Sequence, residues 1–212
     1  TRDTTQPPRG WVDANLIVAQ PVGEFAQYVH NGFGFGGGFN ARLDAAGYVR
    51  LRVDGSYLIY GHEGRTAPLS PTVPEVTVNV NTSNNIFALQ VGPEFAVPSG
   101  AIRPYVNGHV GYSYFFTQSS VSGTSSGDAF ASSENYSDGV TSWGYGGGVR
   151  IPLGGTEHPT MLDIGARYTR SGRTRYLREG SIHRDNGQVT YSPVESETNL
   201  VTYRIGISVG IR

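Results

Sequence analysis

Bulky apolar side chains recur at every second position over eight stretches of this chain. In residues 33–43, Phe33, Phe35 and Phe39 alternate with glycine, asparagine and arginine. The same alternation runs through about 11–20, 49–59, 87–97, 106–116, 143–151, 162–168 and 203–211. A period of two is typical of β-strands, in which successive side chains point to opposite faces. The pattern therefore predicts eight strands, each with one apolar face.

The opposite face of these strands indicates their surroundings. It is dominated by Gly, Ala and Ser with a few Arg, Asp and Glu, as at Gly144, Gly146, Gly148 and Arg150. Small residues with sparse charges suit the lumen of a narrow barrel. An outer face rich in Phe, Tyr, Trp and Ile suits lipid. We therefore predict an all-β fold, a closed antiparallel up-and-down transmembrane β-barrel of eight strands.

The connections between the predicted strands alternate in length. Those at 44–47, 98–101 and 152–160 are short and rich in Gly, Pro and Asp, as tight turns require. Those at about 61–85, 118–139 and 170–199 are long, and only the one at 21–32 is compact. Transmembrane barrels place short turns in the periplasm and longer loops outside. We expect one barrel domain over residues 11–212 with both termini periplasmic, after a flexible segment over 1–10 that reads like a processed N-terminus.

Two features depart from a simple eight-stranded pattern. Pro93 lies inside the fourth stretch and cannot donate to a strand ladder, so we expect a bulge or a local break there. Val76, Val78 and Val80 alternate in the opposite register to Phe87, which predicts an extracellular strand extension or a small hairpin. Together with residues 188–191, this segment would give a ten-stranded barrel, which is the less favoured alternative.

Composition narrows the class of protein. The 212 residues include 30 Gly, 11% aromatic residues and no Cys, with a formal net charge of -1. This aromatic content with low net charge argues against disorder, and near-neutrality argues against a nucleic-acid binder. Without Cys there are no disulfides and no thiolate metal sites. The sequence contains no run of about 18 apolar residues, so it does not predict a membrane-spanning helix. All 16 basic residues are Arg, which suits buried ion pairs because the guanidinium stays charged and pairs bidentately with carboxylates.

Several motifs accompany the alternation. They are the opening strand at 11–18 with Pro21-x-Gly23-x-Phe25 and Gly32-Phe33-Gly34-Phe35-Gly36, then Val91-Gly92-Pro93-Glu94-Phe95 and Arg103-Pro104-Tyr105-Val106-Asn107-Gly108. Together they resemble the small outer-membrane β-barrel family (OmpA/OmpX-like, porin-like barrel domain) over nearly the whole chain. The resemblance implies the outer membrane of a Gram-negative-type bacterium, and it implies a fold better than a task.

One feature departs from this family. Its members usually finish with an aromatic residue that the assembly machinery reads, whereas this sequence reads Val209-Gly210-Ile211-Arg212. The departure leaves open a variant assembly signal, or a barrel that is a subunit of an extracellular filament or layer.

Eleven charged residues fall on the predicted lumen face. They are Asp13, Arg42, Arg50, Arg52, Asp54, Glu94, Arg103, Arg150, Asp163, Arg167 and Arg204. In so narrow a barrel side chains fill the interior, and buried charges must pair because an uncompensated one costs about several kcal/mol. We expect an ion-pair network that plugs the lumen and holds strand register, with the excess of arginine near the periplasmic rim. The alternative is a narrow channel or a binder of a small hydrophobic ligand.

The sequence predicts neither catalysis nor a metal site, and no cofactor is expected. His109 and Ser113 both face the predicted lumen, but they lie about 13 Å apart along one strand, too far for a nucleophile and its base. The other histidines are scattered over loops and turns without ligand spacing: His30, His62, His158 and His183. The Gly-rich runs at 32–38 and 144–148 do not lead from a strand into a helix, so they do not predict a nucleotide site.

The outer wall and the loops carry the remaining candidates. An aromatic belt at the membrane edge is predicted from Tyr57, Tyr112, Tyr114, Phe116, Trp143 and Tyr168. Arg170 and Arg178 share the parity of Tyr168, so they are candidates for contact with lipopolysaccharide phosphates through charge-assisted hydrogen bonds. The same region equally fits a solvated strand extension in which acidic residues balance the arginines: Glu179, Asp185, Glu195 and Glu197.

The segment 119–138 is rich in Ser and Gly and carries acidic but no basic residues. It is predicted to be a mobile, solvated loop whose composition suits adhesion or glycan contact. We therefore expect a structural or surface-interaction role, in adhesion or envelope integrity, exerted through the extracellular loops. The expected partners are the lipid bilayer, lipopolysaccharide, and a surface partner or a further copy of the chain, with no nucleic acid.

Overall fold

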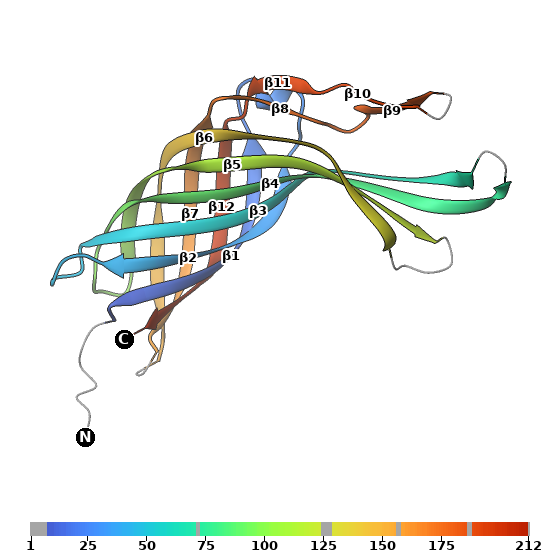
Figure 1. Cartoon of the computed structure of the whole chain (residues 1–212). Coiled ribbons are helices and arrows are strands. Elements are labelled where there is room, and N and C mark those ends of the chain that lie inside the picture. The colour runs from blue at the N-terminus through green and yellow to red at the C-terminus, as the bar shows by residue number, and fades with distance from the viewer. Residues whose placement is uncertain (1–7, 71–72, 124–128, 156–157, 186–187, 212) are drawn as a thin grey trace.

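The computed structural model describes residues 8–70, 73–123, 129–155, 158–185 and 188–211. Eight strands form a closed antiparallel barrel in the order β1-β12-β7-β6-β5-β4-β3-β2 (Figure 1). Their bounds are β1 Gly10–Pro21, β2 Gly32–Arg42, β3 Val49–Ser70, β4 Val73–Ala96, β5 Arg103–Gly123, β6 Ala129–Gly154, β7 Thr160–Ser171 and β12 Leu200–Ile211. Residues 1–7 of the N-terminal segment predicted to be flexible lie outside the described residues.

Four short strands lie outside the ring and form two separate two-stranded sheets. One pairs β8 (Arg173–Tyr176) with β11 (Val194–Glu197), and the other pairs β9 (Ile182–Asp185) with β10 (Gln188–Tyr191). The ten-stranded alternative is therefore wrong, because 188–191 pairs with 182–185 and not with the ring. A single 3-10 turn, η1 (Phe25–Gln27), lies in the described part of the 21–32 connection. No helix among the described residues is both long enough and apolar enough to cross a membrane.

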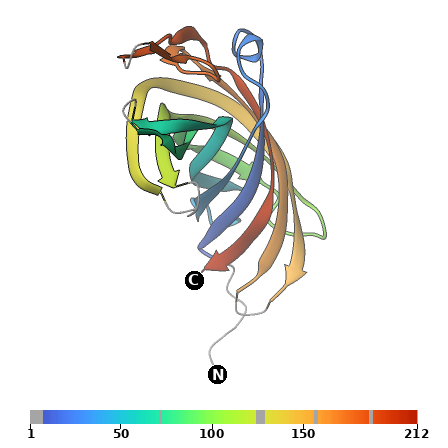
Figure 2. The same ribbon diagram turned by 90° about the vertical axis from the view of Figure 1, so that its right-hand side faces the viewer.

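The ring closes between the first and last strands of the barrel. Twelve residue pairs join β1 to β12, from Gly10 opposite Ile211 to Pro21 opposite Leu200 (Figure 2). In lipid no water is present to satisfy an open strand edge, so closure removes the unpaired backbone groups that would otherwise prevent insertion. The predicted all-β, eight-stranded antiparallel barrel is confirmed.

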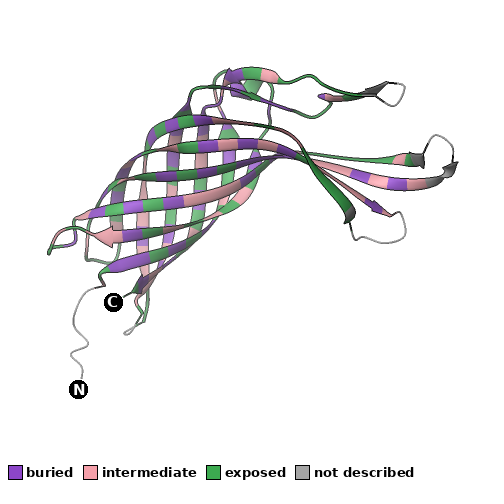
Figure 3. Cartoon of the chain, viewed as in Figure 1, coloured by how far each residue is buried: buried purple, intermediate pink, exposed green. Residues whose placement is uncertain are grey.

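The two faces of the wall differ in the predicted sense. On β2, Phe33 and Phe39 are 62% and 41% exposed on the outer face. Asn40, on the opposite face of the same strand, is fully buried in the lumen. Buried and exposed residues alternate in the same way along the other strands (Figure 3). The wall is therefore apolar outside and polar inside, which is the reverse of a soluble barrel.

Four strands continue beyond the ring as one projecting sheet (Figure 1). The β3–β4 pairing continues to Ser70 opposite Val73, β4 pairs with β5 as far as Gly123, and β5 pairs with β6 as far as Ala129. We call this sheet the fin, comprising residues 61–70, 73–85, 117–123 and 129–141. Register shifts at its base, at 59–61 and 117–118, are β-bulges or similar irregularities, which bend strands.

The fin corrects the expectation of long loops at 61–85 and 118–139. In their described parts both segments are mostly strand, and the loop predicted over 119–138 is wrong outside 124–128, which lies beyond the described residues. The strand extension predicted from the alternating valines is confirmed, since Val78 and Val80 are buried on β4. Serine and asparagine have little intrinsic preference for β-strands, so the composition of these segments did not predict a sheet. Their strands form because the barrel already aligns β3, β4, β5 and β6 side by side.

The local break predicted at Pro93 is confirmed. Pairing of β4 with β5 reaches Val91 opposite Val110 and resumes at Glu94 opposite Asn107 in the same register. Proline has no N–H to donate, so the ladder is interrupted there without an inserted residue. On the other side, β3 still pairs with β4 through this point.

The end of the barrel at which β1 begins and β12 ends carries the short turns, and we call it the short-turn end. In the first of these turns, the carboxylate of Asp44 accepts hydrogen bonds from the N–H groups of Val49 (2.8 Å) and Tyr48 (3.2 Å). The hydrogen bond from Val49 is the main reason that the pKa of Asp44 is lowered. Gly47 has a φ of 85°, which side-chain-bearing residues rarely adopt. The opposite end, with η1, the fin and the short sheets, is the long-loop end.

Candidate functional site

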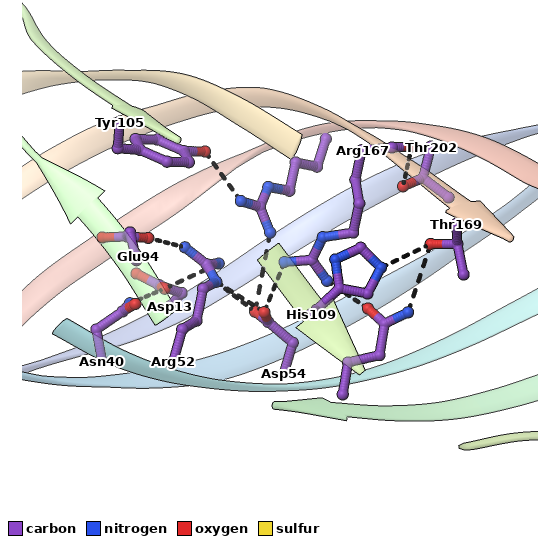
Figure 4. Close-up of polar contacts among 12 residues, drawn as sticks. Asp13, Asn40, Arg52, Asp54, Glu94, Tyr105, His109, Arg167, Thr169 and Thr202 are labelled. Atoms are coloured by element: carbon purple, nitrogen blue, oxygen red, sulfur yellow. Dashed lines mark hydrogen bonds and ion pairs between the residues drawn. The ribbon is translucent and has the colours of Figure 1, made fainter. Parts of the chain in front are cut away.

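The inside of the barrel holds a buried network of charged residues (Figure 4). Nine of the eleven predicted lumen charges belong to it: Asp13, Arg50, Arg52, Asp54, Glu94, Arg150, Asp163, Arg167 and Arg204. The other two, Arg42 and Arg103, are half-buried near the short-turn end, where Arg103 donates to the carbonyl of Gly100 at 3.2 Å. Five arginines thus face four carboxylates in the lumen network, and one positive charge is in excess.

Glu94 is the most heavily contacted acid of the lumen network and is fully buried. Nη1 and Nη2 of Arg150 donate to its two carboxylate oxygens, each at 2.7 Å, in a bidentate pair. Nη1 of Arg52 donates to Oε2 at 2.8 Å, and Arg50 approaches to 3.7 Å. These bonds join β3, β4 and β6, so one carboxylate links three strands of the wall.

Arg52 connects the two halves of the lumen network. Besides Glu94, it contacts Asp54, with Nε to Oδ2 at 2.7 Å, and Asp13, with Nη2 to Oδ2 at 3.2 Å. Asp54 in turn accepts from Nη2 of Arg167 at 2.7 Å and lies 3.8 Å from Nη1 of Arg204. Charge-assisted hydrogen bonds of this kind are the strong ones, and here they run across the lumen from wall to wall.

An aromatic ring accommodates the excess of arginine. The centroid of the Tyr105 ring lies 4.2 Å from the guanidinium carbon of Arg150 and 5.7 Å from that of Arg204. The Tyr105 hydroxyl donates to Asp163 at 2.7 Å and accepts from Arg204 at 2.9 Å. Cation–π attraction is strengthened where the charge is removed from water, so the ring adds to the stabilisation that Arg150 receives from Glu94 and Arg204 from Asp54.

Sequence reasoning missed several uncharged members of the lumen network. Asn40 donates to Asp13 at 2.6 Å, and Gln90 accepts from Arg167. Asn40 lies on β2 and Tyr105 lies on β5. With these two residues, all eight strands of the ring contribute to the lumen network. The alternation along the strand could have placed Tyr105 in the lumen, because it lies two positions from Asn107 and therefore on the same face. It was missed because aromatic residues had been assigned to the outer face.

A second layer closes the lumen toward the long-loop end, and we call it the apolar cap. Its members are buried and mostly apolar: Ala19, Phe25, Val29, Leu58, Tyr60, Ile86, Phe115, Val140, Tyr176 and Leu200. Phe25 comes from η1 and is fully buried, with its ring centroid 5.1 Å from that of Tyr176 and 6.0 Å from that of Phe115. Between the lumen network and the apolar cap lies a cavity of about 50 Å³, lined by polar and small residues on one side and by Leu58, Ile86 and Leu200 of the apolar cap on the other.

The apolar cap corrects the prediction that the whole lumen face is small or polar. The sequence does carry a signal for it, since alternation fails at Tyr57-Leu58-Ile59-Tyr60 and at Tyr114-Phe115-Phe116, where both faces are apolar. Apolar residues on both faces of a lipid-embedded strand indicate a dry interior at that level. The identity of the central residue, Phe25, depends on how the 21–32 connection folds inward.

The histidines lie in different parts of the barrel. Nε2 of His109 lies 3.1 Å from the hydroxyl of Thr169 in the lumen, and Ser113 is buried farther along the same strand. His158 contacts the carbonyl of Gly210 at 3.3 Å, and His183 is exposed. Among the described residues no group of three or more His, Asp or Glu is arranged to hold a metal ion.

The arginines at the long-loop end mostly have carboxylate partners. Arg170 lies 3.7 Å from Glu197, and Arg173 lies 3.2 Å from Glu24 and 3.4 Å from Glu195, which also pairs with Arg175 at 3.0 Å. Of the predicted counter-charges, Glu195 and Glu197 therefore serve this role, while the side chain of Asp185 lies outside the described residues.

Arg178 differs from these three arginines. In the described part of the chain no carboxylate lies within ion-pair distance of it, and its guanidinium carbon lies 5.8 Å from the centroid of the Tyr28 ring. Both residues line a groove of about 550 Å³ at the rim, which also brings together His30 and His62 from separate segments. We call this the rim groove. The sequence placed these histidines as unrelated surface residues.

One carboxylate ties the base of the fin to β8. Asp138 on β6 accepts from the hydroxyl of Thr174 at 2.9 Å and from the N–H of Arg175 at 2.8 Å. Partial burial opposes ionisation, but hydrogen bonds from Arg175, Thr174 and Gly139 outweigh it and lower the pKa of Asp138 below its usual value of 3.8. The negative charge is thus part of this connection.

Comparison with known families decides the identity of the barrel. The model of the outer membrane protein β-barrel domain matches residues 4–212. The chain belongs to this family. The outer-membrane location and the predicted family resemblance are confirmed, and the lipid bilayer surrounds the apolar wall of this outer-membrane barrel. No curated protein matches the chain.

Several solved structures of outer-membrane proteins are similar to this chain. The outer-membrane barrel is similar to Neisserial surface protein A (NspA), with 15% identity, a TM-score of 0.51, and 97% of this chain and 98% of that chain covered. A major outer membrane protein from Thermus thermophilus gives 11% identity, coverage of 93% and 98%, and a TM-score of 0.47. Ail, the attachment invasion locus protein of Yersinia pestis, gives 13% identity, coverage of 96% and 99%, and a TM-score of 0.44.

The six aromatic residues predicted to form the belt lie on the outer wall of this outer-membrane barrel. Tyr112 and Trp143 are exposed on the wall, and the other four predicted members, Tyr57, Tyr114, Phe116 and Tyr168, are half-buried there. Ring contacts link them to each other and to two further rings: Tyr57 to Phe35 and Phe116, Tyr114 to Phe116, and Tyr168 to Tyr145, with centroids 5.6–6.1 Å apart. A role of these rings as a membrane anchor remains a prediction.

Proposed function

We propose that this outer-membrane barrel is a surface-interaction protein, in which a closed and rigid barrel presents the fin to partners outside the cell. Barrels of this class place short turns in the periplasm and long loops outside, which would put the fin on the cell surface. The proposal includes adhesion and contributions to envelope integrity, because both depend on contacts made by the surface loops.

The observation that carries this proposal is the open outline of the fin. β2 pairs with β3 only as far as Ile59, and β7 pairs with β6 only from Ser142. Beyond these points, in the described residues, no strand pairs with the outer edge of β3 or of β6. Hydrogen bonds to residues 172–180 engage only the base of these two edges. Unpaired strand edges bind extended peptides by strand addition, in which main-chain hydrogen bonds supply affinity. The fin is therefore suited to a partner that offers an extended segment.

The packing of the interior supports a lumen that is blocked along its length. The lumen network spans the barrel at one level, and the apolar cap fills it at the next. A conducting pore needs a continuous wet path, and dry apolar layers oppose the passage of ions. We infer that the lumen network and the apolar cap plug the lumen and that the barrel is a rigid support, so we expect no stable conductance steps from the wild-type protein in planar bilayers.

The direct test removes the fin and keeps the barrel. Residues 64–81 and 118–135 are each replaced by a two-residue Asn-Gly turn, which joins the paired residues Glu63 and Thr82 on one side and Thr117 and Tyr136 on the other. A control variant shortens the β9–β10 hairpin at 183–190 in the same way. Both variants should show the gel shift on boiling that marks a folded barrel. Cells of a non-adherent strain that display the wild-type protein should bind extracellular-matrix proteins or host cells. We expect the fin deletion to abolish this binding and the control to retain it; equal binding by both would refute the role of the fin.

A further inference from the structure

The rim groove lies between the 28–31 segment, the 59–62 part of β3 and the 178–179 turn. At about 550 Å³ its size is typical of a site for a small ligand or a headgroup. It lies at the base of the fin, where it is lined by Gly61, His62 and Asn84, and neither the lumen network nor the proposed partner-binding edges use it. Two properties of its lining indicate what it binds.

The first property is that the rim groove is apolar at one end. Phe33 and Ile59 face each other across the β2–β3 pairing, and both side chains lie on the lipid-facing wall, 62% and 42% exposed. They line the rim groove together with Tyr28 and Tyr60. The rim groove therefore begins at the apolar outer wall and rises toward the polar rim. A ligand that follows it needs an apolar chain as well as a polar head.

The second property is the guanidinium of Arg178, which has no carboxylate within ion-pair distance among the described residues. Arg178 follows Leu177, which is buried and whose carbonyl accepts from the Tyr60 hydroxyl at 3.0 Å. The N–H of Arg178 donates to Ser181 at 3.2 Å. The three neighbouring arginines at 170, 173 and 175 have their charge matched by glutamates, whereas that of Arg178 is available. An Arg guanidinium pairs with phosphate through parallel charge-assisted hydrogen bonds.

The turn that carries Arg178 is attached to β3 at two points. The carboxylate of Glu179 accepts from the N–H of His62 at 3.2 Å, and that of Glu63 accepts from the N–H of Gly180 at 3.1 Å. Glu179 lines the rim groove as well, but this hydrogen bond engages one of its oxygens. A site whose backbone is already held loses less entropy on binding, so the arrangement favours a bound headgroup.

We infer that the rim groove binds one phosphorylated, acylated glycolipid of the outer leaflet, of the lipopolysaccharide type. Its phosphate pairs with Arg178, its sugar hydroxyls reach His30 and Asn31, and one acyl chain lies along Phe33 and Ile59. Of the two arginines that the sequence made candidates for this contact, the structure assigns it to Arg178. The inference shares with the proposed function only the outward orientation of the long-loop end.

Binding to the folded full-length barrel in detergent micelles tests this inference. Native mass spectrometry counts the lipid that remains bound after titration with bisphosphorylated lipid A. Parallel titrations use fully dephosphorylated lipid A, phosphatidylglycerol and inorganic phosphate. We expect one lipid A per barrel, weaker binding of phosphatidylglycerol, and a loss of about tenfold in affinity without the phosphates, the effect of about one charge-assisted hydrogen bond.

Matched substitutions locate the two ends of the ligand. Arg178→Gln should lower the affinity for lipid A about tenfold, whereas Arg170→Gln, which removes the same charge from an arginine paired with Glu197, should stay within about twofold. Phe33→Ala should weaken lipid A several-fold, and Phe39→Ala, on the same strand and the same face, should not. The gel shift on boiling confirms that each variant is folded.

Three results would overturn the inference. Equal losses for Arg170→Gln and Arg178→Gln would indicate general electrostatic attraction. Equal affinity for dephosphorylated lipid A would remove the role of the phosphate. Inorganic phosphate that binds as tightly as lipid A would indicate a free-anion site. None of these results affects the adhesion test of the fin, so the two proposals can fail separately.

Discussion

Removing the carboxylate of Glu94 should destabilise the barrel more than removing the whole pair that it forms with Arg150. Glu94 is fully buried and accepts three charge-assisted hydrogen bonds, two from Arg150 and one from Arg52. Glu94→Leu leaves both guanidinium groups without it and raises the excess positive charge of the lumen network from one to two. Breaking a buried ion pair by removing one partner costs about 3–5 kcal/mol, so we expect a loss of that size in the free energy of unfolding.

The double substitution separates the cost of an orphaned charge from the worth of the pair. In Glu94→Leu with Arg150→Met, the excess returns to one, and Arg52 keeps Asp54 and Asp13. Apolar replacement of a whole buried pair is often close to neutral, so the double variant should lose less than about 2 kcal/mol. Arg150→Met alone should lie between, because Glu94 keeps Arg52.

Urea titration in phospholipid vesicles measures these differences, with the folded and unfolded forms resolved by their migration on an unboiled gel. Glu134→Gln, at an exposed carboxylate of the fin, is the control and should change stability by less than about 0.5 kcal/mol. The reasoning fails if Glu94→Leu costs less than about 1 kcal/mol, or if the two single losses simply add in the double variant, since residues that act as a pair are not additive.

Three further predictions concern the apolar cap, the wall and the fin. Phe25→Ala should cost about 3–5 kcal/mol in the same titration by leaving a cavity among aromatic rings; a loss below about 1 kcal/mol would contradict its role. Gly144→Ala should prevent folding, judged by the gel shift, because a Cβ there would overlap backbone and ring atoms, while Gly55→Ala, which meets nothing, should fold normally. Because the pKa of Asp138 is lowered in the folded state, its contribution is complete above about pH 4 and is lost as the pH falls below that value. The protection of the Arg175 amide, measured as its exchange rate relative to the intrinsic rate at each pH, should accordingly fall as the pH drops below about 4, and Asp138→Asn should remove this pH dependence.

Much of the wall was predictable because its pattern is local. Successive strand residues point to opposite faces, so Phe33, Phe35 and Phe39 could be assigned to lipid and Asn40 to the lumen without knowing any partner. The same parity placed nine charges inside the barrel. The break at Pro93 was also local, since it follows from the missing N–H of one residue type.

The pairings inside the lumen were beyond the sequence. Arg52 meets Glu94 from 42 positions away, and Arg167 meets Asp54 from 113 positions away. Strand tilt and register decide which side chains reach each other across the lumen, and neither is encoded in the alternation of a single strand. The same holds for the position of the Tyr105 ring beside Arg150 and Arg204.

By itself, the sequence determined the fold class of this barrel, its lipid-facing and enclosed surfaces, and its membrane, because a two-residue period and a lipid environment leave few alternatives. Only the tertiary structure decided that the fin is a sheet, that Phe25 occupies the apolar cap, and that Arg178, unlike Arg170, has no carboxylate partner in the part of the chain that the structure describes. Each of these depends on contacts between segments far apart in the chain. Closure of the ring brings these segments together, and no local sequence pattern encodes which of them meet.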